Sequence, residues 1–244
     1  LGFMVYAPYG RSGVYPLQAA FGAVLADLPP QDRLSRAKGI FDSLPDGHLF
    51  KSNPHVVDHE TSDAGFYDLL LHTQDQAFDV ASLFSVLEET DWKLQSFCEP
   101  MRYDLTRFCT PPNGMGIAAQ MAAAEQFDGT MKVHVGYARP KSAPDFKRDM
   151  ACIPHLRGAH PAKIAAAVAK GKPLPFTRAG QTVRISLPAA AAPLIAGCNG
   201  RRSLSEIARA TKTDPIAFNT LWAPVEASLI GWGLLLYSDF LRKA

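Results

Sequence analysis

The stretch that decides the fold runs from residue 66 to residue 94 and reads FYDLLLHTQDQAFDVASLFSVLEETDWKL. Ser62 or Asp63 stands before it as an N-cap, so its first part predicts a helix that ends near Thr73. Asp79 caps a second helix, whose apolar residues fall on one face. The last residues, WKL, begin a pattern that alternates as a strand does. Two helices that lead into a strand indicate an α/β fold.

Upstream of this stretch, residues 2–7 (GFMVYA) form a short apolar run that Pro8 ends. Such a run suits a strand buried on both faces, as in a parallel sheet. A buried strand needs neighbours on both sides, so we expect an upstream half in this chain or in another. Residues 14–28 and 31–43 have helical spacing, whereas residues 46–60 read as a loop.

Downstream, residues 92–99 and 131–138 alternate as strands, and residues 114–127 between them predict a helix. In the later strand, the residues at positions 131, 133, 135 and 137 face one way, which predicts the side turned to the core. The order of residues 1–140 is therefore strand, helical insertion, helix, strand, helix, strand. This order predicts the second half of an α/β domain, with residues 13–91 as its helical lid.

The composition changes after residue 140. Residues 141–182 are rich in proline and predict a linker, and residues 183–244 predict a compact module of three short helices bracketed by strands. In that module Ser203 and Glu206 form a capping-box motif, SLSE. The arrangement resembles a small winged-helix-like domain.

The overall composition excludes several classes of function. The 244 residues carry a formal net charge of +2, which gives no case for nucleic acid or an anionic membrane as a partner. No apolar run is long enough to span a membrane, and no signal peptide opens the chain. The 4 cysteines contain no CxxC pair, which favours a reducing cytoplasm over a disulfide framework.

Taken together, these patterns resemble the C-terminal half of a class I S-adenosylmethionine-dependent methyltransferase. GFMVYAPYG resembles its fifth strand, and DLLLHTQDQAF resembles a "DLL–H–Q–(D/E)–F" signature that one subgroup carries after it. WKLQSFCE and TMKVHVGYARP then follow in the order of the sixth and seventh strands. The resemblance implies a partial Rossmann-like sheet of late strands with a helical insertion.

The resemblance also implies a function. The protein would transfer a methyl group from S-adenosylmethionine to a small-molecule or peptide acceptor, and this chain would supply the substrate side. The family holds the cofactor with a glycine-rich loop in its first half, and no Gly-x-Gly-x-Gly occurs here. The cofactor-binding residues are therefore expected upstream of Leu1, and an upstream segment or a second copy of the chain is an expected partner.

The candidate catalytic residues are His72 and Asp75, because a histidine can take a proton near neutral pH and a carboxylate can orient it. The alternative is a structural role, in which His72 interacts with the free carbonyls at the C-terminal end of a helix and Asp75 caps the next turn. Six residues are candidates for binding the acceptor: Tyr6, Tyr9, Arg11, Tyr67, Asp68 and Gln74. Asp68 and His72 also share a helix face at i, i+4 spacing, which allows a carboxylate–imidazole pair.

A metal site and a non-catalytic function are the two alternatives to a methyltransferase. His48, His55 and His59 lie on the predicted loop, but their spacing matches no recognisable zinc pattern, so no metal site is expected. The rival function is a non-catalytic binding module that lacks the cofactor site and holds a partner protein in its cleft and tail.

Overall fold

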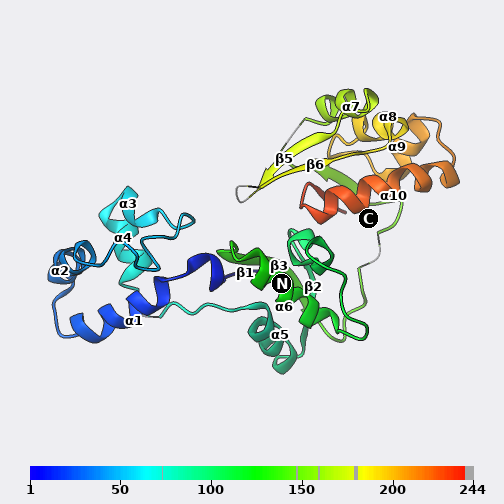
Figure 1. Cartoon of the computed structure of the whole chain (residues 1–244). Helices are drawn as coiled ribbons and strands as arrows, with labels where there is room; N and C mark the ends of the chain where they lie inside the picture. The colour runs from blue at the N-terminus through cyan, green and yellow to red at the C-terminus, as the bar shows by residue number, and fades with distance from the viewer. Residues whose placement is uncertain (73, 147, 159, 179–180, 240–244) are drawn as a thin grey trace. The chain divides into compact units, whose positions relative to one another are not determined.

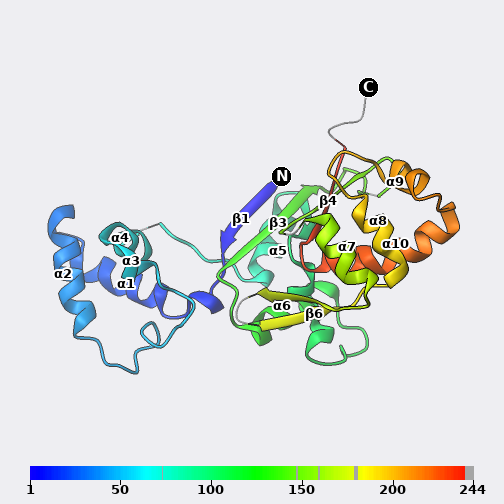
Figure 2. The ribbon, with the colours of Figure 1, turned by 90° about the horizontal axis from the view of Figure 1, so that it is seen from above.

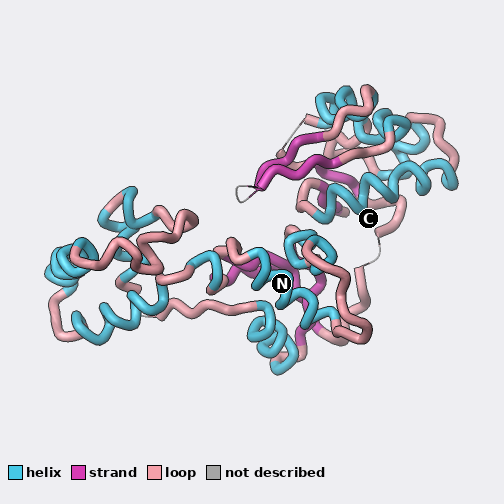
Figure 3. The backbone as a smooth tube through the Cα atoms, viewed as in Figure 1, coloured by secondary structure: helices cyan, strands magenta, loops and turns pink. Residues whose placement is uncertain are grey.

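The computed structural model describes residues 1–72, 74–146, 148–158, 160–178 and 181–239, and it shows a mixed α/β chain (Figures 1 and 3). The chain divides into two compact units. The first comprises residues 1–94 and 103–139, and the second comprises residues 95–102 and 140–244. Thr73, where the first quoted helix was predicted to end, lies outside the described residues. Parts of the predicted linker and the last five residues of the predicted module lie outside them as well.

The first unit opens with a strand and four helices: β1 (Gly2–Tyr6), α1 (Val14–Leu25), α2 (Pro30–Asp42), α3 (Asp58–Thr61) and α4 (Asp63–Leu70). The four helices pack around a core of their own, which includes Phe21, Phe50 and Phe66. Residues 46–60 were predicted as loop, and most of them are, but Phe50 is only 1% exposed. Its ring meets that of Phe41 edge to face, with the ring centroids 5.5 Å apart. This apolar contact draws the loop into the core.

A three-stranded sheet and two further α-helices follow along the described chain. They are α5 (Val80–Glu89), β2 (Trp92–Phe97), α6 (Ile117–Asp128) and β3 (Val133–Pro140), and residues 95–97 of β2 are counted with the second unit. The strand order is β1-β3-β2, so the last strand lies between the two earlier ones (Figures 1 and 2). β1 and β3 are antiparallel, with Gly2 opposite Tyr137 and Tyr6 opposite Val133.

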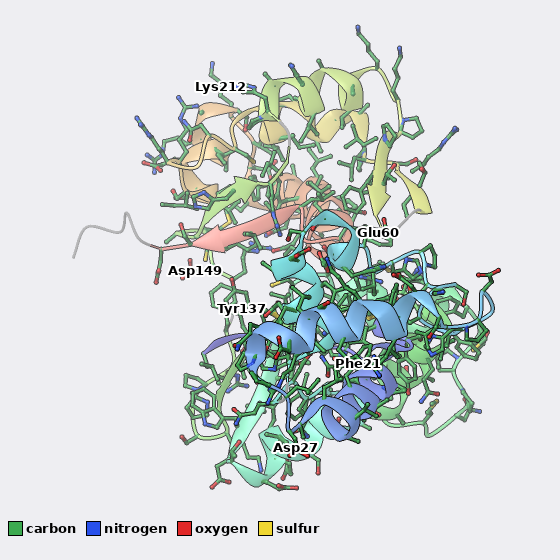
Figure 4. All side chains as sticks on the ribbon, turned by 90° about the vertical axis from the view of Figure 1, so that its left-hand side faces the viewer. Phe21, Asp27, Glu60, Tyr137, Asp149 and Lys212 are labelled. Atoms are coloured by element: carbon green, nitrogen blue, oxygen red, sulfur yellow. The ribbon has the colours of Figure 1, made fainter. Side chains whose placement is uncertain are left out.

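The predicted parallel sheet does not occur among the described residues, because β1 pairs with an antiparallel neighbour. β1 is not buried on both faces either, since Met4 is 57% exposed. The partner opposite Met4 is Val135, and directly opposed residues share a sheet face. Val135 is also exposed, as is Tyr137, which Figure 4 labels, so the face of the strand pair that carries Met4, Val135 and Tyr137 is the exposed one.

The covered face of β3 carries His134 and Ala138, which are 0% and 3% exposed. The prediction that positions 133, 135 and 137 face the core is therefore wrong, although the alternation itself is confirmed. His134 is buried because it has partners there. Its Nδ1 atom lies 2.7 Å from the hydroxyl of Tyr103, and its Nε2 atom lies 3.0 Å from Glu125.

The described residues of the second unit from 140 onward form β4 (Ile153–Leu156), α7 (Pro161–Ala169), β5 (Leu174–Arg178), β6 (Gln181–Ile185), α8 (Ala192–Ala196), α9 (Leu204–Ala210), α10 (Pro215–Gly231) and β7 (Leu235–Ser238). Two antiparallel pairs form, β4 with β7 and β5 with β6. The predicted capping box of Ser203 and Glu206 is confirmed at the start of α9. Trp222 is fully buried, and its indole N–H donates to the Tyr237 hydroxyl at 2.8 Å.

Residues 141–182, which read as a linker, contribute β4, α7 and β5 to the second unit. Ala165 and Val168 of α7 belong to the same hydrophobic core as Trp222. The prolines of this segment stand where the elements tolerate them, as Pro161 does in the first turn of α7. The high proline content of residues 141–182 therefore reflects short, closely spaced helices and strands, and not an unstructured linker.

Candidate functional site

A groove lies beside β1 and the segment that follows α4. Its volume is about 370 Å³, and its walls come from residues 4–6 and from residues between 68 and 78. Five of the eight predicted site residues line it: Tyr6, Asp68, His72, Gln74 and Asp75. Met4, Val5 and Phe78 add apolar surface. The main-chain N–H of Phe78 donates to the carbonyl of Tyr6 at 2.9 Å, so a backbone hydrogen bond joins the two segments.

The centre of the site is a buried ion pair between Arg11 and Asp75. Nη2 of Arg11 donates to Oδ2 of Asp75 at 2.7 Å, and the two side chains are only 8% and 6% exposed. The guanidinium carbon also lies 3.9 Å from the centroid of the Tyr6 ring. A buried charge needs a partner with good geometry, and each of these charges has one. Three predicted site residues therefore form one contact cluster.

Two residues that sequence reasoning missed complete this cluster. Nε of Arg11 donates to the Tyr15 hydroxyl at 3.0 Å, and Nε2 of Gln18 donates to Oδ2 of Asp75 at 3.2 Å. Burial raises the pKa of Tyr15, partly opposed by the charge of Arg11. The signal available in the sequence was spacing, because Tyr15 follows Arg11 by four residues and precedes Gln18 by three.

Asp75 presents one oxygen to the groove. Its Oδ2 atom accepts hydrogen bonds from Arg11 and Gln18, whereas no donor of the described residues bonds to Oδ1. Because Asp75 lines the groove, this oxygen is the acceptor that remains for a ligand. The ion pair balances the charge of the carboxylate, so a ligand with a neutral O–H or N–H can bind there.

His72 follows α4 and is exposed. Its Nδ1 atom accepts the main-chain N–H of Gln74 at 3.2 Å. The neutral ring therefore carries its proton on Nε2, which makes that atom a hydrogen-bond donor toward a ligand. No hydrogen bond or ion pair joins His72 to Asp68 or to Asp75 in the described structure. The predicted Asp68–His72 pair does not form, although both residues line the groove.

The other predicted residues lie apart from the groove. Tyr9 does not line it, and its hydroxyl accepts from Nε2 of Gln126 at 3.2 Å. Tyr67 is half-buried in α4 and does not line the groove, although its carbonyl accepts the main-chain N–H of Leu71. Sequence proximity suggested both residues, but Tyr67 and Asp68 are adjacent in α4 and therefore point to different sides of the helix.

The glycines near the groove do not form a nucleoside cradle. A Cβ atom on Gly10 would lie 2.5 Å from the backbone of Met131, and one on Gly13 would lie 2.5 Å from the nitrogen of Phe50. These glycines therefore allow the chain to pack against itself. Neither Gly10 nor Gly13 therefore leaves room for a nucleoside at its Cα.

The described residues contain no cluster of metal-ligating side chains and no helix that could cross a membrane. No group of three or more histidine, cysteine, aspartate or glutamate side chains in that part of the chain is placed to hold a metal ion. His59, one of the three loop histidines, instead packs against Phe50, with the ring centroids 4.8 Å apart. Within the same described part, every helix is too short or too polar to cross a bilayer.

No model of a known protein family matches this chain, and no curated protein matches it.

Proposed function

We propose that this chain supplies the acceptor-binding part of an S-adenosylmethionine-dependent methyltransferase of class I. One observation carries the proposal. Tyr6 at the end of β1 and Asp68, His72, Gln74 and Asp75 after it line one groove, although they come from two separate segments. The sequence predicts His72 and Asp75 as catalytic residues and Tyr6, Asp68 and Gln74 as acceptor-binding residues. The three strands that carry the resemblance also lie in a single sheet.

In this proposal, the residues of this chain bind and orient the methyl acceptor. Oδ1 of Asp75 accepts a hydrogen bond from the acceptor's O–H or N–H, and Nε2 of His72 donates one to an oxygen or nitrogen lone pair. Arg11, Gln18 and Tyr15 hold Asp75 in place. Methyl transfer depends chiefly on such positioning. S-adenosylmethionine supplies the methyl group in this proposal, and a segment other than the described residues binds it.

The rival function is a non-catalytic binding module, and one observation favours it. Gly10 and Gly13, the glycines that follow β1, pack against the chain itself and are therefore not available to approach a cofactor. In this version the same groove holds a ligand or a partner, and no methyl group is transferred. The binding roles of Asp75 and His72 are the same in both versions.

Two measurements on the purified protein separate the two functions. The first is calorimetric titration with S-adenosylhomocysteine, together with the intact mass. The second is transfer of a radiolabelled methyl group from S-adenosylmethionine to a panel of small molecules and peptides. The methyltransferase predicts binding of S-adenosylhomocysteine and turnover of some acceptor. Absence of both in a protein heavier than these 244 residues rejects the methyltransferase. Absence of both in a protein of this chain's own mass withdraws the catalytic assignment of this chain and supports the binding module.

Variants then test the site. We expect Asp75→Asn and His72→Gln each to lower kcat/KM about tenfold or more, which corresponds to about 1.4 kcal/mol of lost transition-state stabilisation. Glu89→Gln is the matched control, because Glu89 is exposed at the end of α5 and does not line the groove. Unchanged turnover in both groove variants rejects the assignment of these residues.

A further inference from the structure

A second cavity, which we call the α1 cavity, adjoins the groove and has a volume of about 480 Å³. It shares two residues with the groove, His72 and Asp75. From there it runs along α1, where Phe21, Leu25 and Leu71 provide apolar walls. Figure 4 labels Phe21 on this helix and Asp27 just beyond its end. A volume of this size accommodates most of a small organic molecule.

Arg33 gives the α1 cavity a positive charge. Its Nε and Nη2 atoms donate to the carbonyls of Leu28 and Ala26, both at 2.8 Å, and these bonds fix the guanidinium past the end of α1. Among the described residues, no carboxylate forms an ion pair with Arg33, although Asp27 and Asp32 are near it in sequence. Nη1 makes no hydrogen bond to a described residue, so it remains available to an anion.

We infer that the α1 cavity binds the tail of the acceptor, and that this tail is an apolar chain that ends in a carboxylate. The inference rests on the proposed function, because it takes Asp75 and His72 to hold the reacting end. The apolar walls match a hydrocarbon chain. A guanidinium with spare N–H groups matches a carboxylate, with which it forms strong charge-assisted hydrogen bonds.

Gly22 allows a direct test of this cavity. It lines the cavity from inside α1, and a Cβ atom built on it meets nothing within 4 Å. Gly22→Phe therefore places a ring in the cavity without a clash at its Cβ. Gly39→Phe is the matched control, because Gly39 is also a helical glycine with nothing within 4 Å of its Cβ. Gly39 lies in α2 and does not line the α1 cavity.

The experiment is calorimetric titration of the purified protein with octanoate and with 1-octanol, a neutral probe of similar length. We expect octanoate to bind about tenfold more tightly than 1-octanol, a difference of about 1.4 kcal/mol. Gly22→Phe weakens octanoate binding at least tenfold, and Gly39→Phe leaves it unchanged. Arg33→Met removes the preference for octanoate, and Arg33→Lys retains part of it because the charge remains.

Two results overturn the inference: no binding of octanoate, or octanoate binding that Gly22→Phe leaves unchanged. Circular dichroism checks that each variant is folded. If Arg33→Met unfolds, Gly22→Phe and Gly39→Phe still test whether octanoate binds in the α1 cavity. Octanoate binding needs no cofactor and no turnover. Failure of the α1 cavity is therefore distinguishable from failure of the methyltransferase proposal, which the titration with S-adenosylhomocysteine tests.

Discussion

Nε2 of His134 lies 3.0 Å from Oε1 of Glu125, and the two side chains are 0% and 1% exposed. The other carboxylate oxygen of Glu125 accepts the main-chain N–H of Val80 at 2.8 Å. One buried carboxylate thus joins β3 to the first turn of α5, near the positive end of that helix's dipole. This polar contact connects three elements of the first unit, because Glu125 itself belongs to α6.

We therefore expect Glu125→Ala to destabilise the first unit strongly. The change removes the carboxylate that accepts from the Val80 N–H and contacts the His134 ring. Because both groups are buried, we expect the free energy of unfolding to fall by about 3 kcal/mol or more. Urea denaturation followed by circular dichroism measures the loss. Gln126→Ala, at the exposed neighbouring position on α6, should change the free energy of unfolding by less than about 0.5 kcal/mol. Equal effects of the two substitutions would contradict the structural role of Glu125.

Asp79 caps α5 by accepting the main-chain N–H of Ser82 at 2.7 Å. We expect Asp79→Ala to lower the free energy of unfolding by about 1 kcal/mol at pH 7. Hydrogen bonds from the side chain and backbone of Ser82 hold the pKa of Asp79 below its usual value of 3.8. The stabilisation is therefore present above that value and is lost as the pH falls through the lowered pKa.

The difference in stability between Asp79→Ala and the unmodified chain should consequently shrink when urea denaturation is repeated at low pH. Asp79→Ser serves as the control, because a serine caps a helix without titrating. A difference that stays constant from neutral to acidic pH would show that the Asp79 charge has no part in the cap.

Cys109 and Cys198 should differ sharply in reactivity. Cys109 is exposed, whereas Cys198 is buried, and burial raises the pKa of its thiol from 9.0 to about 12. Because the thiolate is the reactive form, we expect Cys109 to react readily with a disulfide reagent at pH 8 and Cys198 to react only after unfolding. Mass mapping of labelled peptides measures this, and Cys109→Ser should abolish the labelling at that position. Rapid labelling of Cys198 in the folded protein would refute its burial.

The same pKa shift has a consequence for stability. The unfolded chain ionises Cys198 at its ordinary pKa of 9.0, while the folded chain keeps it protonated. The contribution of this thiol to the free energy of unfolding is therefore complete below pH 9 and declines as the pH rises above it.

Gly22 and Gly10 should respond in opposite ways to an added methyl group. Gly22→Ala places the methyl in open space within a helix, so we expect a gain of about 0.5 to 1 kcal/mol. Gly10→Ala places its methyl 2.5 Å from the backbone of Met131, so we expect a loss of about 2 kcal/mol. Urea midpoints of the two variants test this, and a shift in the same direction for both would contradict the packing described.

The parts of the fold that the sequence predicted are those set by neighbours along the chain. Asp79 and Ser203 were predicted as N-caps, and both accept the expected main-chain N–H groups. These interactions span three residues, so local composition is enough to reveal them. The helical spacing of residues 14–28 and the alternation of residues 131–138 likewise reflect local geometry.

What the sequence did not reveal depends on contacts between distant residues. The side of β3 that is buried follows from the partners of His134, which lie 9 and 31 residues away. The bond from Arg11 to Asp75 spans 64 residues, so no local pattern indicated that these two candidates would meet. Tyr9 and Tyr67 were predicted to bind the acceptor because they are close in sequence to other candidates. Neither residue lines the groove.

The Arg11–Asp75 ion pair and the hydrogen bond from Phe78 to Tyr6 have a consequence for how this chain can change. Together they fasten the two ends of the α1–α4 segment side by side. A segment whose ends are held together behaves as a loop, and the entropy of closing a loop depends only weakly on its length. The chain between α1 and α4 can therefore lengthen or shorten while α1 keeps Tyr15 and Gln18 against the ion pair.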